Sequence, residues 1–367
     1  MLNICIVAGA RPNFIKIAPL VRAISKAKDN GKDIDCKLIY AGREDDPTLE
    51  PSIFSDLEIR KPDVYLGVDS SNLNELTGRV MAEFEKYLNS NPTDIVIVVD
   101  DLASTMAVAI VTKKEGITLA HLVAGTRSFD IRMPKEINRL VIDGLSDLLF
   151  TAGMGSNSIV SREGAELSNV YMVGNILMDT FRSNLCRLER PSFFDKAGID
   201  ERKYIVFTIN RKVLLADTQK LRSLIESFCK NAAGIKIIAP LRSTAKNIVS
   251  DLTKEYTNFM IAEPMSYLEF GYLTSHAMGI VTDSGNVAEE ATFNSIPCIT
   301  LNSYTEHIET VKYGSNVLVG EDADKLGKAV SEMVSGSWKK CSLPDRWDGH
   351  TAERIVQILL EVGNKSK

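Results

Sequence analysis

The stretch Gly279-Ile-Val-Thr-Asp-Ser-Gly-Asn-Val-Ala-Glu-Glu-Ala291 decides the fold of this chain. Its opening residues Ile280 and Val281 form a short apolar run, which is typical of a buried parallel strand. The small polar residues from Thr282 to Asn286 then predict a turn, and a helix can begin at Val287. A strand that passes through a tight turn into a helix is the building unit of α/β folds, so we expect that class here.

The turn in this stretch has the properties of a phosphate-binding site. Ser284 and Gly285 would leave free backbone N–H groups at the positive end of the helix, where a phosphate can bind without a metal or a lysine. Glu289 and Glu290 follow one turn later, where a carboxylate can accept hydrogen bonds from a ribose diol. The same pattern also fits an ordinary corner whose helix is capped by Asp or Ser. The stretch alone leaves both interpretations open.

Similar units extend on both sides of this stretch. Apolar runs without alternation are separated by helical patterns, the clearest of which places Leu73, Leu76, Val80, Phe84 and Leu88 on one face. Such runs predict parallel sheets that are covered by helices on both faces. The expected strands are 4–8, 36–41, 64–66, 95–99, 118–123, 148–151 and 170–173, then 204–208, 235–239, 259–262, 279–282, 298–301 and 317–319.

A less regular segment, 185–202, separates the two sets of strands. We therefore predict an α/β fold with two Rossmann-like domains, residues 1–178 and 179–350, and with a boundary near 175–190. Ligand pockets favour domain interfaces, so a cleft between the two domains is the expected binding site.

Composition excludes several classes of function. The 367 residues carry a formal net charge of −5 with both signs interspersed, so we expect no nucleic-acid partner. The six cysteines form no CxxC pair and several lie in apolar runs, which favours reduced thiols. The four histidines lie far apart, so we expect no metal site. The apolar run 4–8 is too short for a signal peptide or a membrane span, which favours a cytoplasmic protein without a membrane partner.

The first expected turn, Gly9-Ala-Arg-Pro12, carries a second set of candidate residues. It places Arg11 and Lys16 near the carboxyl edge of a sheet, where ligands of open α/β sheets bind. Two cations at a strand-end turn favour contact with a ligand over pairing with surface carboxylates.

Several stretches together resemble the non-hydrolysing UDP-N-acetylglucosamine 2-epimerases. They occur in the order found in that family and cover nearly the whole chain. They are Gly9-Ala-Arg-Pro-Asn-Phe-Ile-Lys-Ile-Ala-Pro19, Ala124-Gly-Thr-Arg-Ser-Phe-Asp130, Met133-Pro-Lys-Glu-Ile-Asn-Arg139, Asp143-Gly-Leu-Ser-Asp147, Val173-Gly-Asn175, Thr282-Asp-Ser-Gly285, Glu289-Glu-Ala291, Thr305-Glu306 and Trp347-Asp-Gly349.

The resemblance implies a GT-B architecture in which two Rossmann-like domains close on a UDP-sugar. It also implies that the C-terminal helix, within 351–367, packs back on the first domain, that no cofactor is needed, and that the protein is a homodimer. In such enzymes UDP is eliminated across C1 and C2 as the C2 proton is removed, and re-addition from the other face inverts C2. This chemistry requires an acid and a base tuned near neutral pH and donors for the departing diphosphate.

The residues that would bind UDP match the family pattern. Arg11 and Lys16 match its opening cations, and Arg211 matches the arginine beside its catalytic histidine. The resemblance also assigns diphosphate and ribose contacts to Ser284, Gly285 and Glu290, and a position near the uracil to Phe270.

The residues that would move protons match less well. Asp101 matches the catalytic aspartate, but the glycine before it is Asp100 here. Val123 and Lys135 stand where the family has glutamates, and Asn210 stands where it has histidine. Valine cannot transfer a proton, lysine reverses the charge, and asparagine does not titrate. Loss of one general acid or base typically costs on the order of 10²–10⁴ in rate, so impaired or redirected epimerase chemistry is expected.

The candidate catalytic groups are therefore Asp101, Glu136, Asn210 and Lys135, and Asp100, Asp130 and Glu44 are candidate substitutes. Structural roles compete with these: Asp100 or Asp101 could cap the helix that follows, and Glu136 could cap its own helix. His121 is expected to be a satisfied core histidine. Phe14 and Phe129 are expected in the core, as Phe270 would be without its matching position.

Three functions remain open on the sequence alone. The first is an active 2-epimerase with altered acid-base groups, and the second is a UDP-sugar-binding homologue that serves as a sensor or partner subunit. The third is a GT-B glycosyltransferase or a hydrolysing relative. Turnover of UDP-sugars with and without acceptors distinguishes the three.

Overall fold

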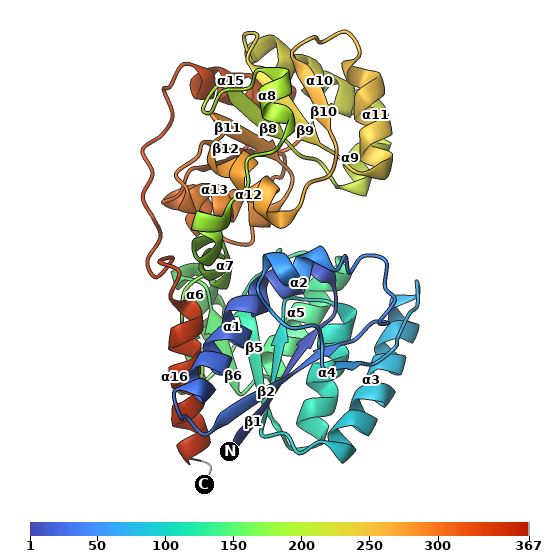
Figure 1. Cartoon of the computed structure of the whole chain (residues 1–367), viewed down its shortest axis with the longest axis vertical. Helices are drawn as coiled ribbons and strands as arrows, with labels where there is room; N and C mark the ends of the chain where they lie inside the picture. The colour runs from blue at the N-terminus through green and yellow to red at the C-terminus, as the bar shows by residue number, and fades with distance from the viewer. Residues whose placement is uncertain (366–367) are drawn as a thin grey trace. The chain divides into compact units, whose positions relative to one another are not determined.

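A computed structural model describes residues 1–365 as two compact α/β units (Figure 1). The first unit holds residues 1–183 together with the chain from Asp345 onward, and the second holds Asn184–Pro344.

The first unit is built on a seven-stranded parallel sheet in the order β3-β2-β1-β4-β5-β6-β7. All five residues of β4 are buried because helices cover both faces of the sheet, which explains its unbroken apolar run. The strands are β1 (Leu2–Ala8), β2 (Ile34–Tyr40), β3 (Val64–Tyr65), β4 (Ile95–Val99), β5 (Thr118–Ala124), β6 (Leu148–Thr151) and β7 (Val170–Met172). The helices are α1 (Arg11–Asp29), α2 (Ser52–Asp56), α3 (Leu73–Ser90), α4 (Ala103–Lys114), α5 (Pro134–Leu145), α6 (Met154–Arg162), α7 (Ile176–Asn184) and α16 (Thr351–Lys365).

The second unit repeats this plan with a six-stranded parallel sheet in the order β10-β9-β8-β11-β12-β13. Its strands are β8 (Tyr204–Phe207), β9 (Lys236–Pro240), β10 (Phe259–Ala262), β11 (Gly279–Thr282), β12 (Cys298–Thr300) and β13 (Asn316–Leu318). Its helices are α8 (Phe193–Ala197), α9 (Lys212–Ala216), α10 (Thr218–Asn231), α11 (Ser243–Thr253), α12 (Tyr267–Ser275), α13 (Gly285–Phe293), α14 (Glu309–Lys312) and α15 (Ala323–Val334).

Each sheet has one point at which the strand order reverses. The reversal lies between β1 and β4 in the first unit and between β8 and β11 in the second. Ligands of open α/β sheets bind outside the carboxyl ends of the strands at such a point. Arg11, Asp101, Arg211 and Ser284 all follow these four strands, so the topology itself selects the segments that carry the predicted site residues.

The predicted fold class is confirmed, and each predicted strand is present with its ends shifted by no more than two residues. One helix start was placed wrongly, because α13 begins at Gly285 and not at Val287. A small polar turn residue is compatible with the first turn of a helix, so the apolar pattern marks the start too late.

The chain after the second sheet returns to the first unit through a buried anchor. Trp347 is 0% exposed, and its indole N–H donates to the carbonyl oxygen of Ala152 at 3.0 Å. Asp179 on α7 accepts the N–H of Ala352 at 2.7 Å, so a residue of another helix caps the start of α16. Helix α16 then lies along α1 (Figure 1). Residues 366 and 367, the last two of the predicted C-terminal helix, lie outside the described residues.

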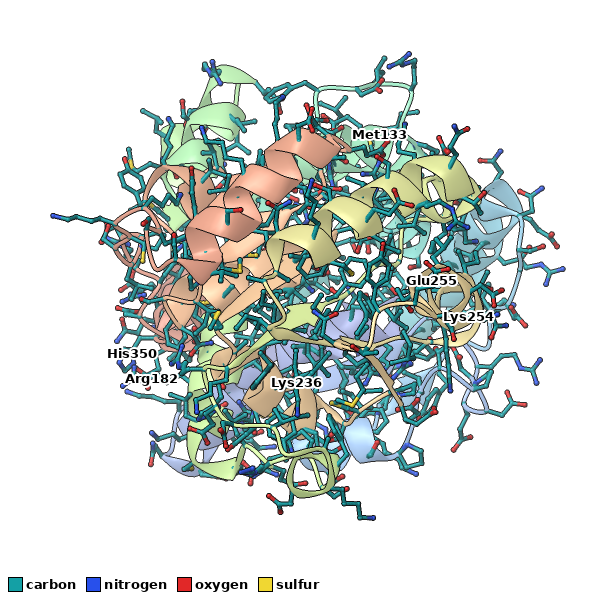
Figure 2. All side chains as sticks on the ribbon, turned by 90° about the horizontal axis from the view of Figure 1, so that it is seen from above. Met133, Arg182, Lys236, Lys254, Glu255 and His350 are labelled. Atoms are coloured by element: carbon teal, nitrogen blue, oxygen red, sulfur yellow. The ribbon has the colours of Figure 1, made fainter. Side chains whose placement is uncertain are left out.

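The returning segment is also tied to α7 at the surface. Arg182 donates to the carbonyl oxygen of Asp348 at 2.8 Å and contacts the ring of His350, and the two side chains are neighbours in Figure 2. Gly174 sits at φ 103°, and a Cβ at this position would overlap the carbonyl oxygen of Arg346. No helix within residues 1–365 is both long enough and apolar enough to span a membrane.

We expect Trp347→Ala to lower the free energy of unfolding of the first unit by about 3–5 kcal/mol, because a fully buried indole leaves a cavity and an unpaired carbonyl. Urea unfolding followed by circular dichroism measures this. Trp347→Phe keeps most of the packing and should cost clearly less. Equal stability of the Ala variant and the unaltered protein would contradict the anchoring role.

Candidate functional site

The start of α13 in the second unit is open to an anion. Ser284 occupies the N-cap position, but its side chain makes no capping hydrogen bond. The prediction of a free N–H at Ser284 was wrong, because this N–H donates to the hydroxyl of Thr282 at 3.0 Å. The same hydroxyl contacts the Thr208 hydroxyl at 2.6 Å. A Cβ at Gly285 would meet nothing closer than 3.9 Å. The first-turn N–H groups therefore keep the uncapped geometry that a phosphate can use.

Asp283 fixes the loop after β8 against the start of α13. One oxygen of its carboxylate accepts the N–H groups of both Asn210 and Arg211 at 2.7 Å. Its other oxygen is buried with no hydrogen-bond partner. Asp283 was not among the predicted site residues, although it lies inside the stretch Thr282-Asp-Ser-Gly285. The signal that could have identified it is an acidic residue between the end of a strand and the start of a helix.

The guanidinium of Arg211 contacts residues that follow the carboxyl ends of β12 and β13. It donates to the carbonyl oxygen of Leu301 at 3.1 Å and to the side-chain oxygen of Asn302 at 2.9 Å. Its third contact is an ion pair with Glu321 at 3.2 Å. The structure therefore brings Asn210 and Arg211 next to the open end of α13, as a diphosphate site requires.

Glu290 is buried, whereas Ser284 and Gly285 at the start of α13 are not. Its carboxyl accepts the hydroxyl of Tyr267 on α12 at 3.4 Å, and Glu289 lies beside it, 3.6 Å from His307. Burial, with a smaller contribution from the charge of Glu289, raises the pKa of Glu290 to about 8. Phe270, also on α12, is half-buried and packs against the apolar cluster that contains Val287. Glu290 and Phe270 thus belong to the packed face between α12 and α13.

In the first unit the predicted binding residue Lys16 pairs with Asp100, the residue before Asp101. Its ammonium lies 2.6 Å from Asp100, whose second oxygen accepts the side-chain N–H of Asn13 at 2.8 Å. Asn13 in turn accepts the backbone N–H groups of Gly9 and Ala10, which closes the turn before α1. The carboxylate of Asp100 therefore supports the turn before Arg11, which is the first residue of α1.

Asp101 and Glu136 are held by one buried arginine. Arg139, 1% exposed, donates two N–H groups to Asp101, at 2.8 and 2.6 Å, and a third to Glu136 at 3.0 Å. Lys135 lies 3.2 Å from the other oxygen of Asp101. Burial alone would raise the pKa of Asp101, but Lys135 and Arg139 outweigh it and the pKa lies below its ordinary value. The structure thus brings three predicted residues, Asp101, Lys135 and Glu136, together at the start of α5.

Glu136 organises the loop before α5. Its carboxylate accepts the N–H groups of Ser128 and Phe129 at 2.9 Å, so it anchors the loop and does not cap its own helix. These bonds lower the pKa of Glu136, against the opposing effect of burial. The expectation that Phe129 lies in the core was wrong: it is 72% exposed at φ 60°, because the anchored loop turns its ring outward. Phe14 is fully buried, as expected.

Neither Asp100 nor Asp101 caps α4, since Leu102 is the N-cap residue and has no side-chain cap. The capping alternative for these two residues was therefore wrong. Both carboxylates instead pair with cations of α1 and α5, which burial favours over solvent-facing caps.

His121 is a core residue, as predicted. Its Nδ1 lies 2.6 Å from Asp143 and its Nε2 lies 3.0 Å from the carbonyl oxygen of Asp100. Two residues later, Val123 adopts φ 72° where the pairing of β5 with β6 shifts register. A β-branched residue at positive φ is strained, and such strain gathers at functional sites.

Within residues 1–365 no group of three His, Cys, Asp or Glu side chains is arranged to hold a metal ion.

The raised pKa of Glu290 predicts a pH effect on stability. Because its folded pKa is above its unfolded value, the folded protein binds the extra proton between pH 4.5 and about 8. The stabilising contribution is full below that window, and stability falls as pH rises through it, by on the order of 1 kcal/mol per pH unit. Urea unfolding at several pH values should show a flatter profile for Glu290→Gln. The control is Glu332→Gln, which changes an exposed glutamate. Parallel profiles for Glu290→Gln and the unaltered protein would contradict the assignment.

Known proteins of one enzyme family are similar to this chain. Residues 26–360 match the family described as UDP-N-acetylglucosamine 2-epimerase. The UDP-N-acetylglucosamine 2-epimerase of Methanocaldococcus jannaschii is 34% identical over 373 residues, covering 98% of this chain and 99% of that protein. The UDP-2,3-diacetamido-2,3-dideoxy-D-glucuronate 2-epimerase of Pseudomonas aeruginosa is 30% identical and covers 89% of this chain and 90% of that protein.

Solved structures extend the similarity to three dimensions. The M. jannaschii UDP-GlcNAc 2-epimerase crystallised with UDP-GlcNAc and UDP superposes with a TM-score of 0.85 at 32% identity, covering 98% of this chain and all of that one. The lipopolysaccharide galactosyltransferase WaaB shares the fold alone, with a TM-score of 0.56 at 14% identity. Together with the matched residues, these similarities show that the chain belongs to the UDP-N-acetylglucosamine 2-epimerase family.

Proposed function

We propose that this protein binds a UDP-sugar and that 2-epimerisation of the sugar is slow in it. The second unit would bind the nucleotide, and the strand-end groups of the first unit would carry the proton transfers. The observation that carries the proposal is the ion pair between Lys135 and Asp101, because it neutralises the carboxylate that the family resemblance assigns to catalysis.

The binding part rests on the start of α13. Its N–H groups are uncapped at Ser284, and Gly285 leaves room for a close approach of phosphate oxygens. Arg211 lies at the neighbouring strand ends with a guanidinium that can bind two phosphate oxygens at once. A relative of 32% identity was crystallised with UDP-GlcNAc and UDP, which supports the same ligand class here.

The chemical part rests on the state of the first unit's carboxylates. Removal of the C2 proton needs a base whose pKa lies near the working pH. Asp101 has a lowered pKa because Lys135 and Arg139 outweigh its burial, and Glu136 has a lowered pKa because loop N–H groups bind it. Asp100 is paired with Lys16. Asp101 and Glu136, stabilised as anions in this way, are weak bases, so a slow step is expected.

The residue types at Val123, Asn210 and Lys135 would also lower the rate. Val123 has no group that exchanges protons, Asn210 does not titrate, and Lys135 has a positive charge where the family resemblance implies a negative one. In the extreme case the protein binds a UDP-sugar without turnover and acts as a sensor or partner subunit.

UDP binding is the first test. Isothermal titration calorimetry should show saturable binding of UDP, weakened at least tenfold by Arg211→Ala, because the charge-assisted contact with the diphosphate is lost. Glu290→Ala should also weaken UDP binding, because the carboxyl group that would bind the ribose is lost. Arg222→Ala removes the same charge from an exposed position on α10 and should have no effect. Absence of any UDP binding by the unaltered protein would refute the proposed function.

Restoring the family's residues is the second test. With UDP-GlcNAc as substrate, Val123→Glu, Lys135→Glu and Asn210→His combined should raise the rate of UDP-ManNAc formation by on the order of 10²-fold or more. Lys61→Glu reverses the charge of an exposed lysine elsewhere in the first unit and is the control. A fast unaltered protein, with kcat of about 10 s⁻¹ or above, would overturn the claim of slowed chemistry while leaving UDP binding intact.

A further inference from the structure

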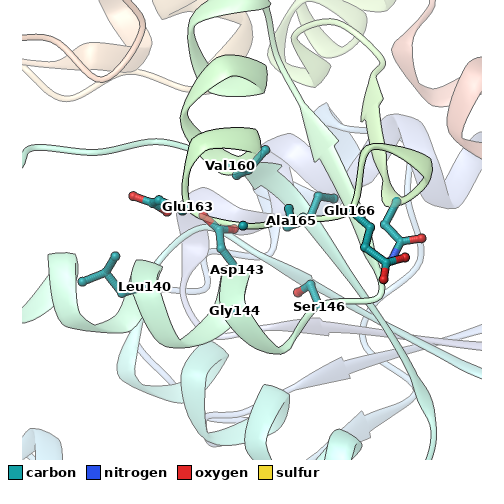
Figure 3. A pocket seen from close by; sticks show the side chains of 11 residues that line it. Leu140, Asp143, Gly144, Ser146, Val160, Glu163, Ala165 and Glu166 are labelled. Atoms are coloured by element: carbon teal, nitrogen blue, oxygen red, sulfur yellow. The ribbon is translucent and has the colours of Figure 1, made fainter.

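A cavity of about 520 Å³ lies in the first unit between the last turns of α5 and α6 (Figure 3). Its lining comes from the segments 140–149 and 160–169. The volume falls within the range of about 300–1,000 Å³ that small-molecule pockets occupy. Asp143, Gly144 and Ser146 belong to the stretch Asp143-Gly-Leu-Ser-Asp147 that resembles the family, but none of the predicted catalytic or UDP-binding residues lines this cavity.

The cavity is separate from the candidate site of the same unit. Lys135 and Glu136 belong to the first turn of α5, whereas Gly144 and Ser146 mark its end. A helix rises about 1.5 Å per residue, so about two turns of α5 separate Glu136 from Gly144. A ligand in the cavity would not compete with one at the strand ends.

The charges around the cavity have one sign. The ionisable side chains of its lining are Asp143, Glu163 and Glu166. Arg127, 1% exposed, bridges the first two from inside the protein, at 2.7 Å from Asp143 and 2.5 Å from Glu163. His121 also contacts Asp143, at 2.6 Å, but Glu166 is exposed and lies outside these contacts. Two partners are still fewer than three carboxylates, so the wall keeps a negative excess.

The backbone adds to this field. Helix α5 ends at Leu145 and α6 ends at Arg162, and both C-terminal ends lie at the cavity. The C-terminal end of a helix carries partial negative charge, although the last carbonyl groups of α6 accept N–H groups of the residues that follow it. Two such ends beside three carboxylates favour a positively charged ligand.

The remaining lining defines the shape of that ligand. Leu140, Leu149, Val160 and Ala165 form an apolar wall, and Ser146 and Asn169 can hydrogen-bond. An apolar wall beside carboxylates suits an alkyl chain that ends in ammonium groups. We propose that this cavity binds a small aliphatic polyamine.

Gly144 provides a variant that fills the cavity without disturbing the fold. It lies in the last turn of α5 and lines the cavity, and a Cβ there would meet no atom within 4 Å. Leucine is also a better helix former than glycine, so Gly144→Leu should fold. Gly78 on α3 has the same open surroundings, which makes Gly78→Leu a matched control.

The test is calorimetric titration of the full chain with putrescine. We expect saturable binding that weakens as salt is added, because the attraction is electrostatic. The uncharged chain of equal length, 1,4-butanediol, should bind at least tenfold more weakly. Equal binding of the two compounds, or no putrescine binding at all, would overturn the proposal.

The variants locate the binding site. Gly144→Leu should abolish putrescine binding, and Glu166→Gln should weaken it severalfold. Gly78→Leu and Glu115→Gln, which alters an exposed glutamate at the end of α4, should leave it unchanged. Binding that survives Gly144→Leu unaltered would refute this location. UDP binding should be the same in Gly144→Leu and in the unaltered protein, so this test is independent of the proposed function.

Discussion

The buried guanidinium of Arg139 is the interaction on which the first unit's candidate site depends. It joins the strand-end residue Asp101 to Glu136, and Glu136 in turn holds the loop at Ser128 and Phe129. A charge with 1% exposure must be paired, because leaving it unpaired in the interior costs several kcal/mol. Helix α5, the end of β4 and the preceding loop are therefore fixed as one assembly.

Asp283 plays the corresponding part in the second unit. A single carboxylate oxygen accepts two backbone N–H groups from the loop after β8, and Asn302 donates to the carbonyl oxygen of Asp283 at 3.2 Å. The loop, the start of α13 and the end of β12 are thereby linked. Both units meet the same requirement: polar groups that gather at the carboxyl ends of parallel strands are buried there, so each needs a partner.

This pairing also separates ligand binding from chemistry. The second unit leaves the first turn of α13 without a side-chain cap from Ser284, which is what an anionic ligand needs. The first unit pairs Asp100 and Asp101 with cations, and the cations beside Asp101 hold the pKa of that carboxyl below its ordinary value. Membership of the 2-epimerase family fixes the fold and the ligand class to be tested, whereas the local pairing governs how well a proton can be moved.

Two parallel sheets, the strand-turn-helix corner at Thr282–Gly285 and the core position of His121 can be predicted from the amino-acid sequence, because they follow from apolar runs and turn residues that are neighbours in the chain. The pairing of Lys16 with Asp100, the exposure of Phe129 and the cavity between α5 and α6 are visible only in the folded protein. Lys16 and Asp100 are 84 residues apart and meet because β1 lies beside β4. Periodicity records only local preferences, whereas strand order decides which distant side chains come within bonding distance.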